Sequence, residues 1–149
     1  MKRAILAALA LAGTATAAFA LAPADTIRMR QANYKQMAAA LKGVNDQLRS
    51  DAPSLPELRR NAGLISRHAL QVLNWFPRGT GAEAGIRTRA KAEIWSDPQG
   101  FRRAGARLLV AARGLDAAAG RGDVAAVRTA FGEVRGACGG CHDAFRAPE

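Results

Sequence analysis

The sequence predicts an all-α protein, an antiparallel four-helix bundle in a single domain. The first observation is composition: alanine is abundant, aromatic residues make up 5% of the chain and β-branched residues are sparse, which favours helices over sheets. The second is periodicity, since apolar residues recur at helical spacing in four segments separated by two short turns and one long connection. A chain of 149 residues has room for one such domain but not comfortably for two.

The first two helices of the bundle are marked by caps and by a break between them. The first helix is expected to start from a cap at residues 24–26 and to reach about Arg49. Its apolar stripe consists of Ile27, Tyr34, Met37, Leu41, Val44 and Leu48. Residues 50–53 break the pattern with a proline, and the S-x-x-E capping box at residues 54–57 then starts a second helix that reaches about Trp75.

The last two helices follow a long connection. Residues 77–93 contain one proline and several glycines and are expected to form that connection. An S-x-x-Q capping box at residues 96–99 predicts the start of a third helix, which reaches about Ala119. Residues 120–122 form a glycine-rich turn, and Asp123 caps a fourth helix that extends toward the C-terminus.

The first twenty residues are typical of a secretory signal peptide. Lys2 and Arg3 form a positive start, residues 4–12 an apolar run, and residues 18–20 a small-x-small cleavage site. Cleavage there leaves a mature domain, residues 21–149, and implies export to the periplasm. The alternative is a buried N-terminal helix. No later stretch is apolar enough to predict a membrane span.

The chain is strongly basic. Removal of Lys2 and Arg3 with the signal peptide lowers the formal net charge from +10 to +8. The remaining cations are spread along the chain instead of clustering with aromatic residues, a pattern that argues against nucleic-acid binding. A solvated basic surface is the favoured interpretation, and it would steer the protein toward acidic partners in a salt-dependent way.

The sequence C-x-x-C-H at residues 138–142 carries the chemistry, since it is the attachment motif for a c-type haem. Positions i, i+3 and i+4 of a helix lie on one face, so Cys138, Cys141 and His142 would point the same way. The two sulfurs could then bond to the two vinyl groups of one haem, and the imidazole of His142 could ligate the iron. The two glycines between the cysteines leave room for the macrocycle.

Three other chemistries compete for the same cysteines. A thioredoxin-like motif begins a helix in a βαβ unit, whereas this pair lies at the end of a helix with no strand nearby. A zinc site needs four ligands, and only His68 could complete the set. A disulfide between Cys138 and Cys141 would be strained and would close almost no loop. Haem attachment is the favoured hypothesis.

Three segments together resemble the cytochrome c′ family, the class II c-type cytochromes. They are RQANYKQM at residues 30–37, EIWSD at residues 93–97, and the run from AFG at residue 130 to CGGCHDAFR at residues 138–146. These segments are spread over essentially all of the mature chain. The resemblance implies a four-helix bundle with its haem near the C-terminal end of the last helix.

The resemblance also implies roles for individual residues. His142 would be the proximal ligand, and Arg146, four residues on, would lie against its imidazole. Arg30 would lie near the haem propionates, a pairing of guanidinium with carboxylate. Tyr34 occupies the position over the distal face of the iron, where low-spin relatives carry a methionine ligand. We therefore expect a high-spin, five-coordinate haem with Tyr34 over the open site.

The function that the resemblance implies is non-enzymatic. The protein would bind nitric oxide and carbon monoxide, transfer electrons to periplasmic redox proteins, or both, and it would form a homodimer. The alternative is a dedicated electron carrier with a six-coordinate iron, for which Met37 is the best ligand candidate and His68 a weaker one. Peroxidase-like catalysis is disfavoured because no distal histidine and acid–base pair can be placed over the iron.

Overall fold

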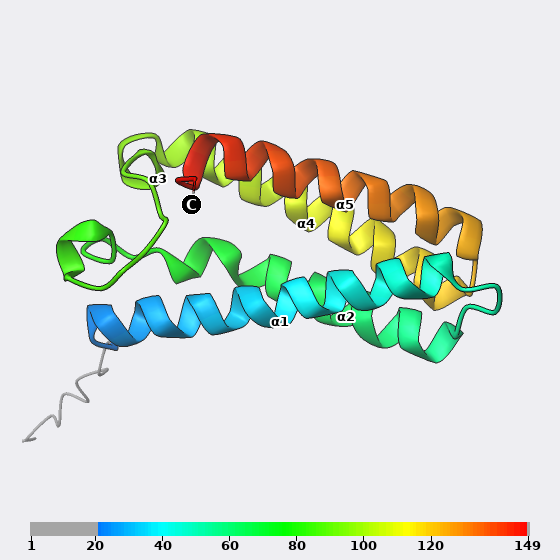
Figure 1. Cartoon of the computed structure of the whole chain (residues 1–149). Helices are drawn as coiled ribbons and strands as arrows, with labels where there is room; N and C mark the ends of the chain where they lie inside the picture. The colour runs from blue at the N-terminus through cyan, green and yellow to red at the C-terminus, as the bar shows by residue number, and fades with distance from the viewer. Residues whose placement is uncertain (1–20, 149) are drawn as a thin grey trace, which may run out of the picture.

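Four long helices form the molecule, as the sequence predicts. The computed structural model describes residues 21–148, and Figure 1 shows its long helices packed as an antiparallel bundle. The long helices are α1 (Pro23–Arg49), α2 (Leu55–Gln71), α4 (Pro98–Arg121) and α5 (Val124–Phe145). Three short helices lie between α2 and α4, namely η1 (Val72–Trp75), η2 (Ala82–Ala84) and α3 (Glu93–Ser96).

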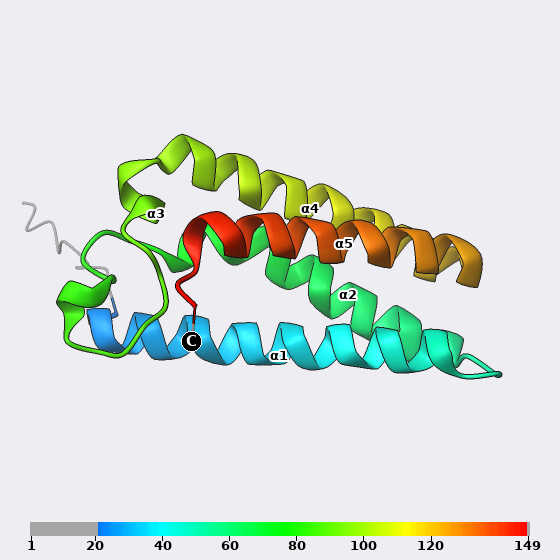
Figure 2. The same ribbon diagram turned by 45° about the horizontal axis from the view of Figure 1, so that its top comes forward.

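The four helices do not contact one another equally. Helix α4 packs extensively on α5 and α2, and α2 packs on α1, whereas α1 and α5 touch over only a short stretch. Figures 1 and 2 show the connection and the C-terminal end of α5 at the same end of the bundle. The core along the bundle axis is closely packed, and its fully buried side chains include Val44, Leu58, Ile65, Leu115, Val127 and Val134.

Two of the predicted helix caps are confirmed. The hydroxyl of Ser54 accepts a hydrogen bond from the backbone N–H of Glu57 at 3.4 Å, which starts α2. The carboxylate of Asp123 accepts one from the N–H of Ala126 at 2.9 Å, which starts α5. Each acceptor satisfies one of the backbone donors that a helix leaves unpaired in its first turn.

The other two predicted helix starts are wrong in detail. Helix α1 begins at Pro23, earlier than the cap expected at residues 24–26, and its preceding residue makes no side-chain cap. Proline is suited to this position because it has no N–H to leave unpaired. Helix α4 is capped by Asp97 and not by Ser96: the Asp97 carboxylate accepts a hydrogen bond from the N–H of Gly100 at 2.8 Å. Ser96 is instead the last residue of α3.

The long connection is confirmed, but it is more ordered than a loop. The indole N–H of Trp95 donates to the backbone carbonyls of Phe76 and Pro77 at 3.1 and 3.2 Å, so the two ends of the connection are held together. A small second core of Ile94, Phe101, Ala104 and Phe145 lies under it. The connection is therefore fixed over the end of the bundle where α5 finishes.

Residues 1–20, the predicted signal peptide, lie outside the described residues. Within the part of the chain that the structure describes, no helix is both long and apolar enough to cross a membrane.

Substitutions at the start of α4 test whether Asp97 or Ser96 caps this helix. The substitution Asp97→Ala should lower the free energy of unfolding by about 1 kcal/mol, because it removes the acceptor for the N–H of Gly100. The neighbouring substitution Ser96→Ala should change it by less than about 0.5 kcal/mol. Urea unfolding followed by circular dichroism measures both. A larger loss for Ser96→Ala than for Asp97→Ala would restore Ser96 as the cap.

Candidate haem site

The last two turns of α5 carry the C-x-x-C-H residues. Cys138 and Cys141 are half-buried and His142 is more exposed, and all three line one cavity. The cysteines are free thiols with no disulfide between them. The helical spacing has therefore placed the three side chains on one face, as predicted.

The cavity lies between α1, α4, α5 and the connection. Its volume is about 520 Å³, within the range of roughly 300–1,000 Å³ that is usual for small-molecule sites. Apolar side chains form most of its wall, among them Leu41, Val72, Phe76, Ile94, Phe101, Leu108 and Phe145. A large, flat and mostly apolar group fits such a space. Two thiols that can form thioether bonds and one imidazole that can ligate iron line it, which matches a covalently attached haem.

Tyr34 faces the cavity from α1, across from the residues of α5. Its ring packs edge-on against Trp75, with ring centroids 5.1 Å apart, and contacts Phe76 at 6.3 Å. Its hydroxyl makes no hydrogen bond with another described residue. Burial, reinforced by the nearby Cys141, raises the pKa of Tyr34 well above its usual value, so the phenol is neutral. The structure thus brings Tyr34 to the same cavity as His142, from a different helix.

Arg30 lines the cavity one turn before Tyr34 and is only 2% exposed. Its guanidinium donates to the hydroxyl and carbonyl oxygens of Thr80 at 3.0 and 2.7 Å, and to the hydroxyl of Thr88 at 2.8 Å. It also lies 4.6 Å above the ring of Phe76. All of these partners are neutral, and burial lowers the pKa of Arg30 from its usual value. The site therefore holds a cation with no bonded carboxylate within residues 21–148.

Sequence reasoning missed Thr80 and Thr88. The hydroxyl of Thr80 donates to the carbonyl of Pro77 at 2.7 Å, so its lone pairs are left to face Arg30. The hydroxyl of Thr88 accepts from the N–H of Ala90 as well as from Arg30. Two threonines in a glycine-rich connection gave no pattern from which these contacts could have been predicted.

Residues 87–91 of the connection line the cavity and run from α1 to the end of α5, where Ala90 forms an isolated antiparallel bridge with Arg146. At one end the side chain of Gln31 donates to the carbonyl of Arg87 at 2.9 Å. At the other, the backbone of Arg89 accepts from the N–H of Ala147 at 2.8 Å, and the N–H of Lys91 donates to the carbonyl of Phe145 at 3.1 Å. This segment, which we name the strap, joins two helices that contact each other little.

Arg146 lies just beyond the last residue of α5, in an extended conformation. The resemblance implies that Arg146, four residues after His142, lies against its imidazole; the structure puts Arg146 past the helix end and at the same cavity as His142. Burial lowers the pKa of His142, and the nearby cations of Arg146 and Arg89 lower it further. The imidazole is therefore held in the neutral form that can ligate a metal.

The two alternative iron ligands, Met37 and His68, lie in different places relative to the cavity. Met37 is buried and lines the cavity, one turn beyond Tyr34. His68 does not line it: its ring lies 3.3 Å from the side chain of Gln36 on α1 and packs against Trp75. Within the described residues, no group of three or more His, Cys, Asp or Glu side chains is arranged to hold a metal ion.

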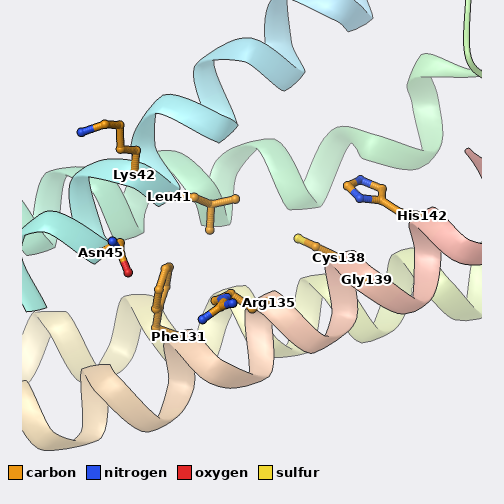
Figure 3. A pocket seen from close by; sticks show the side chains of 8 residues that line it. All are labelled: Leu41, Lys42, Asn45, Phe131, Arg135, Cys138, Gly139 and His142. Atoms are coloured by element: carbon orange, nitrogen blue, oxygen red, sulfur yellow. The ribbon is translucent and has the colours of Figure 1, made fainter. Parts of the chain in front are cut away.

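A second hollow, the α1–α5 groove, continues from the cavity along the surface between these two helices. Its volume is about 420 Å³, and it is lined by Leu41, Lys42, Asn45, Phe131, Arg135, Cys138, Gly139 and His142. Figure 3 shows Leu41 pointing from α1 toward α5, with Phe131 and Cys138 pointing back from α5. Cys138 and His142 line both hollows, so the groove exposes one side of the candidate site.

Known proteins match the chain over nearly its whole described length. The family model for cytochrome c′ matches residues 25–146. A cytochrome c′ of Rubrivivax gelatinosus is 36% identical over 125 residues, which cover 83% of this chain and 95% of the relative.

Solved structures agree with these matches. Cytochrome c′ from Thermochromatium tepidum superposes with a TM-score of 0.79 at 30% identity, covering 86% of this chain and 98% of its own. A cytochrome c′ with ligand-controlled dimer dissociation gives a TM-score of 0.81 at 27% identity, with coverage of 87% and 100%. A nitric oxide complex of a variant of cytochrome c prime from Alcaligenes xylosoxidans gives 0.76 at 28% identity, with coverage of 85% and 97%. The chain belongs to the cytochrome c′ family.

Proposed function

We propose that this cytochrome c′ carries one haem c attached through Cys138 and Cys141, with His142 as the axial ligand of its iron. The observation that carries the proposal is the placement of these three side chains on one face of α5, at the edge of a largely apolar cavity. Bound haem supplies reversible one-electron chemistry and a binding site for small gases. The family is one of non-enzymatic haem proteins, and we assign no catalytic residue.

The buried cation supports a specific orientation of the haem. Arg30 lines the cavity with its guanidinium held among neutral oxygens, and a haem carboxylate would supply a negative charge beside it. Thr88, beside it, also lines the cavity. We therefore propose that the propionate side of the haem faces Arg30 and Thr88, with Arg146 lying beside the proximal imidazole.

The wall opposite His142 supports an open coordination position. Tyr34 is packed by Trp75 and Phe76, and its neutral phenol is a poor iron ligand. The expected result is a five-coordinate, high-spin haem that binds nitric oxide and carbon monoxide, transfers electrons, or both. The relative from Alcaligenes xylosoxidans, which has been solved with bound nitric oxide, supports the gas-binding part.

One observation favours the six-coordinate alternative. Met37 is buried and lines the same cavity as His142, so a methionine sulfur is available on α1. A low-spin carrier dedicated to electron transfer would result if Met37 were the sixth ligand.

Three further proposals concern where and with what the protein works. The signal-peptide pattern of residues 1–20 supports a periplasmic location. The basic surface supports acidic redox partners. The relative with ligand-controlled dimer dissociation supports a homodimer.

The attachment can be tested on denatured protein. Haem staining after denaturing electrophoresis should remain with the wild-type chain, because thioether bonds survive unfolding. The double substitution Cys138→Ser and Cys141→Ser should abolish the stain, whereas His142→Ala should keep it, since the imidazole makes no covalent bond to the porphyrin. Wild-type haem that leaves the unfolded chain would contradict the proposal.

The coordination of the iron can be tested by absorption spectroscopy. The wild-type ferric protein should show a high-spin spectrum, and the substitution Tyr34→Met should convert it to a low-spin one by placing a sulfur at the open position. Met37→Leu serves as the matched control on the same helix and should leave the spectrum unchanged. A low-spin wild type that becomes high-spin on Met37→Leu would establish the six-coordinate alternative.

A further inference from the structure

Cations, and no carboxylates, line the two hollows of the candidate site. The cavity is lined by Arg30, Lys35, Arg89 and Arg146, and the α1–α5 groove by Lys42 and Arg135. Among the described residues, no aspartate or glutamate lines either one.

Two acidic side chains adjoin residues that line this surface. Asp46 pairs with Lys42 at 2.6 Å in an exposed contact that solvent screens strongly. Asp143 follows His142 on α5 and is exposed. Exposed Arg135 in the groove and exposed Lys35 in the adjoining cavity make no ion pair with another residue of 21–148, so the surface keeps a net positive charge. A concave surface lined by one sign of charge concentrates partners of the opposite sign.

The groove is also where the attached group would come near the outside of the molecule. Cys138 lines the groove as well as the cavity, so a haem bonded to its sulfur would have one edge at the groove floor. Helices α1 and α5 pack on each other over only a short stretch. The opposite side of the bundle, formed by α2 and α4, is closed by extensive packing.

We propose that the α1–α5 groove is the docking surface for an acidic electron-transfer protein, with Lys42 on one bank and Arg135 on the other. The proposal rests on the proposed redox function and adds to it the place and the charge of the partner. Complementary charge raises the rate of encounter and fixes the orientation of the complex more than it adds affinity. Docking there would bring the partner's redox centre toward the Cys138 edge of the haem.

The test compares two pairs of charge reversals in the haem-loaded protein. The groove pair is Lys42→Glu with Arg135→Glu, and neither residue lines the haem cavity. The matched control pair is Arg67→Glu with Arg113→Glu, two exposed cations on α2 and α4. Both pairs change the net charge equally. The probe is reduced flavodoxin, an acidic one-electron donor, and the readout is the second-order rate constant of haem reduction over a range of salt concentrations.

We expect the groove pair to slow reduction at low salt by at least about tenfold and to flatten the salt dependence, while the control pair changes the rate by less than about twofold. Equal slowing by both pairs would show that only net charge matters and would overturn the proposal. So would an unchanged rate in the groove pair.

A neutral hydroquinone as a second donor separates this inference from the proposed function. All variants should react with it at the wild-type rate, because it is not steered by charge. If the wild type were not reduced by either donor, the redox function itself would fail. If it were reduced by both and the groove pair behaved like the control, the docking surface alone would be wrong.

Discussion

The space between α1 and α5 at the C-terminal end of the bundle is the constraint on which the site depends. Elsewhere the helices pack closely, and these two would be expected to close as well. The strap bridges the space between them, since it is bonded to Gln31 on α1 and to Phe145 and Ala147 at the end of α5. The aromatic rings of Phe76, Phe101 and Phe145 also line this space. The result is a cavity with His142 on one wall and Tyr34 on the other.

Arg30 links this space to the connection. Within residues 21–148 its guanidinium bonds neutral oxygens of Thr80 and Thr88, and a charge buried in that way is costly unless an anion joins it. The same contacts fasten the connection to α1, so a group that balances the charge would also strengthen the closure of the cavity. If the haem carboxylates bind at Arg30 as proposed, their binding and the order of the strap would be coupled through this side chain.

Features that depend on residues close together in the sequence could be predicted. Contacts between residues far apart in the sequence could not. The face shared by Cys138 and His142 and the caps at Ser54 and Asp123 depend on residues within a few positions of each other, so spacing alone revealed them. The contacts of Arg30 join residues 50 and 58 positions away, which no local pattern reports. Asp97 displaced Ser96 as a cap because the unpredicted helix α3 ends at Ser96, a tertiary effect.

The central claim is that His142 is the only axial protein ligand of a haem whose other face is open beneath Tyr34. Resonance Raman spectroscopy of the ferrous protein tests it most directly. The structure predicts an iron–histidine stretching band that shifts when histidine is labelled with nitrogen-15 and that persists in the His68→Gln variant. Absence of that band in the ferrous wild type, or its loss on His68→Gln, would contradict the claim.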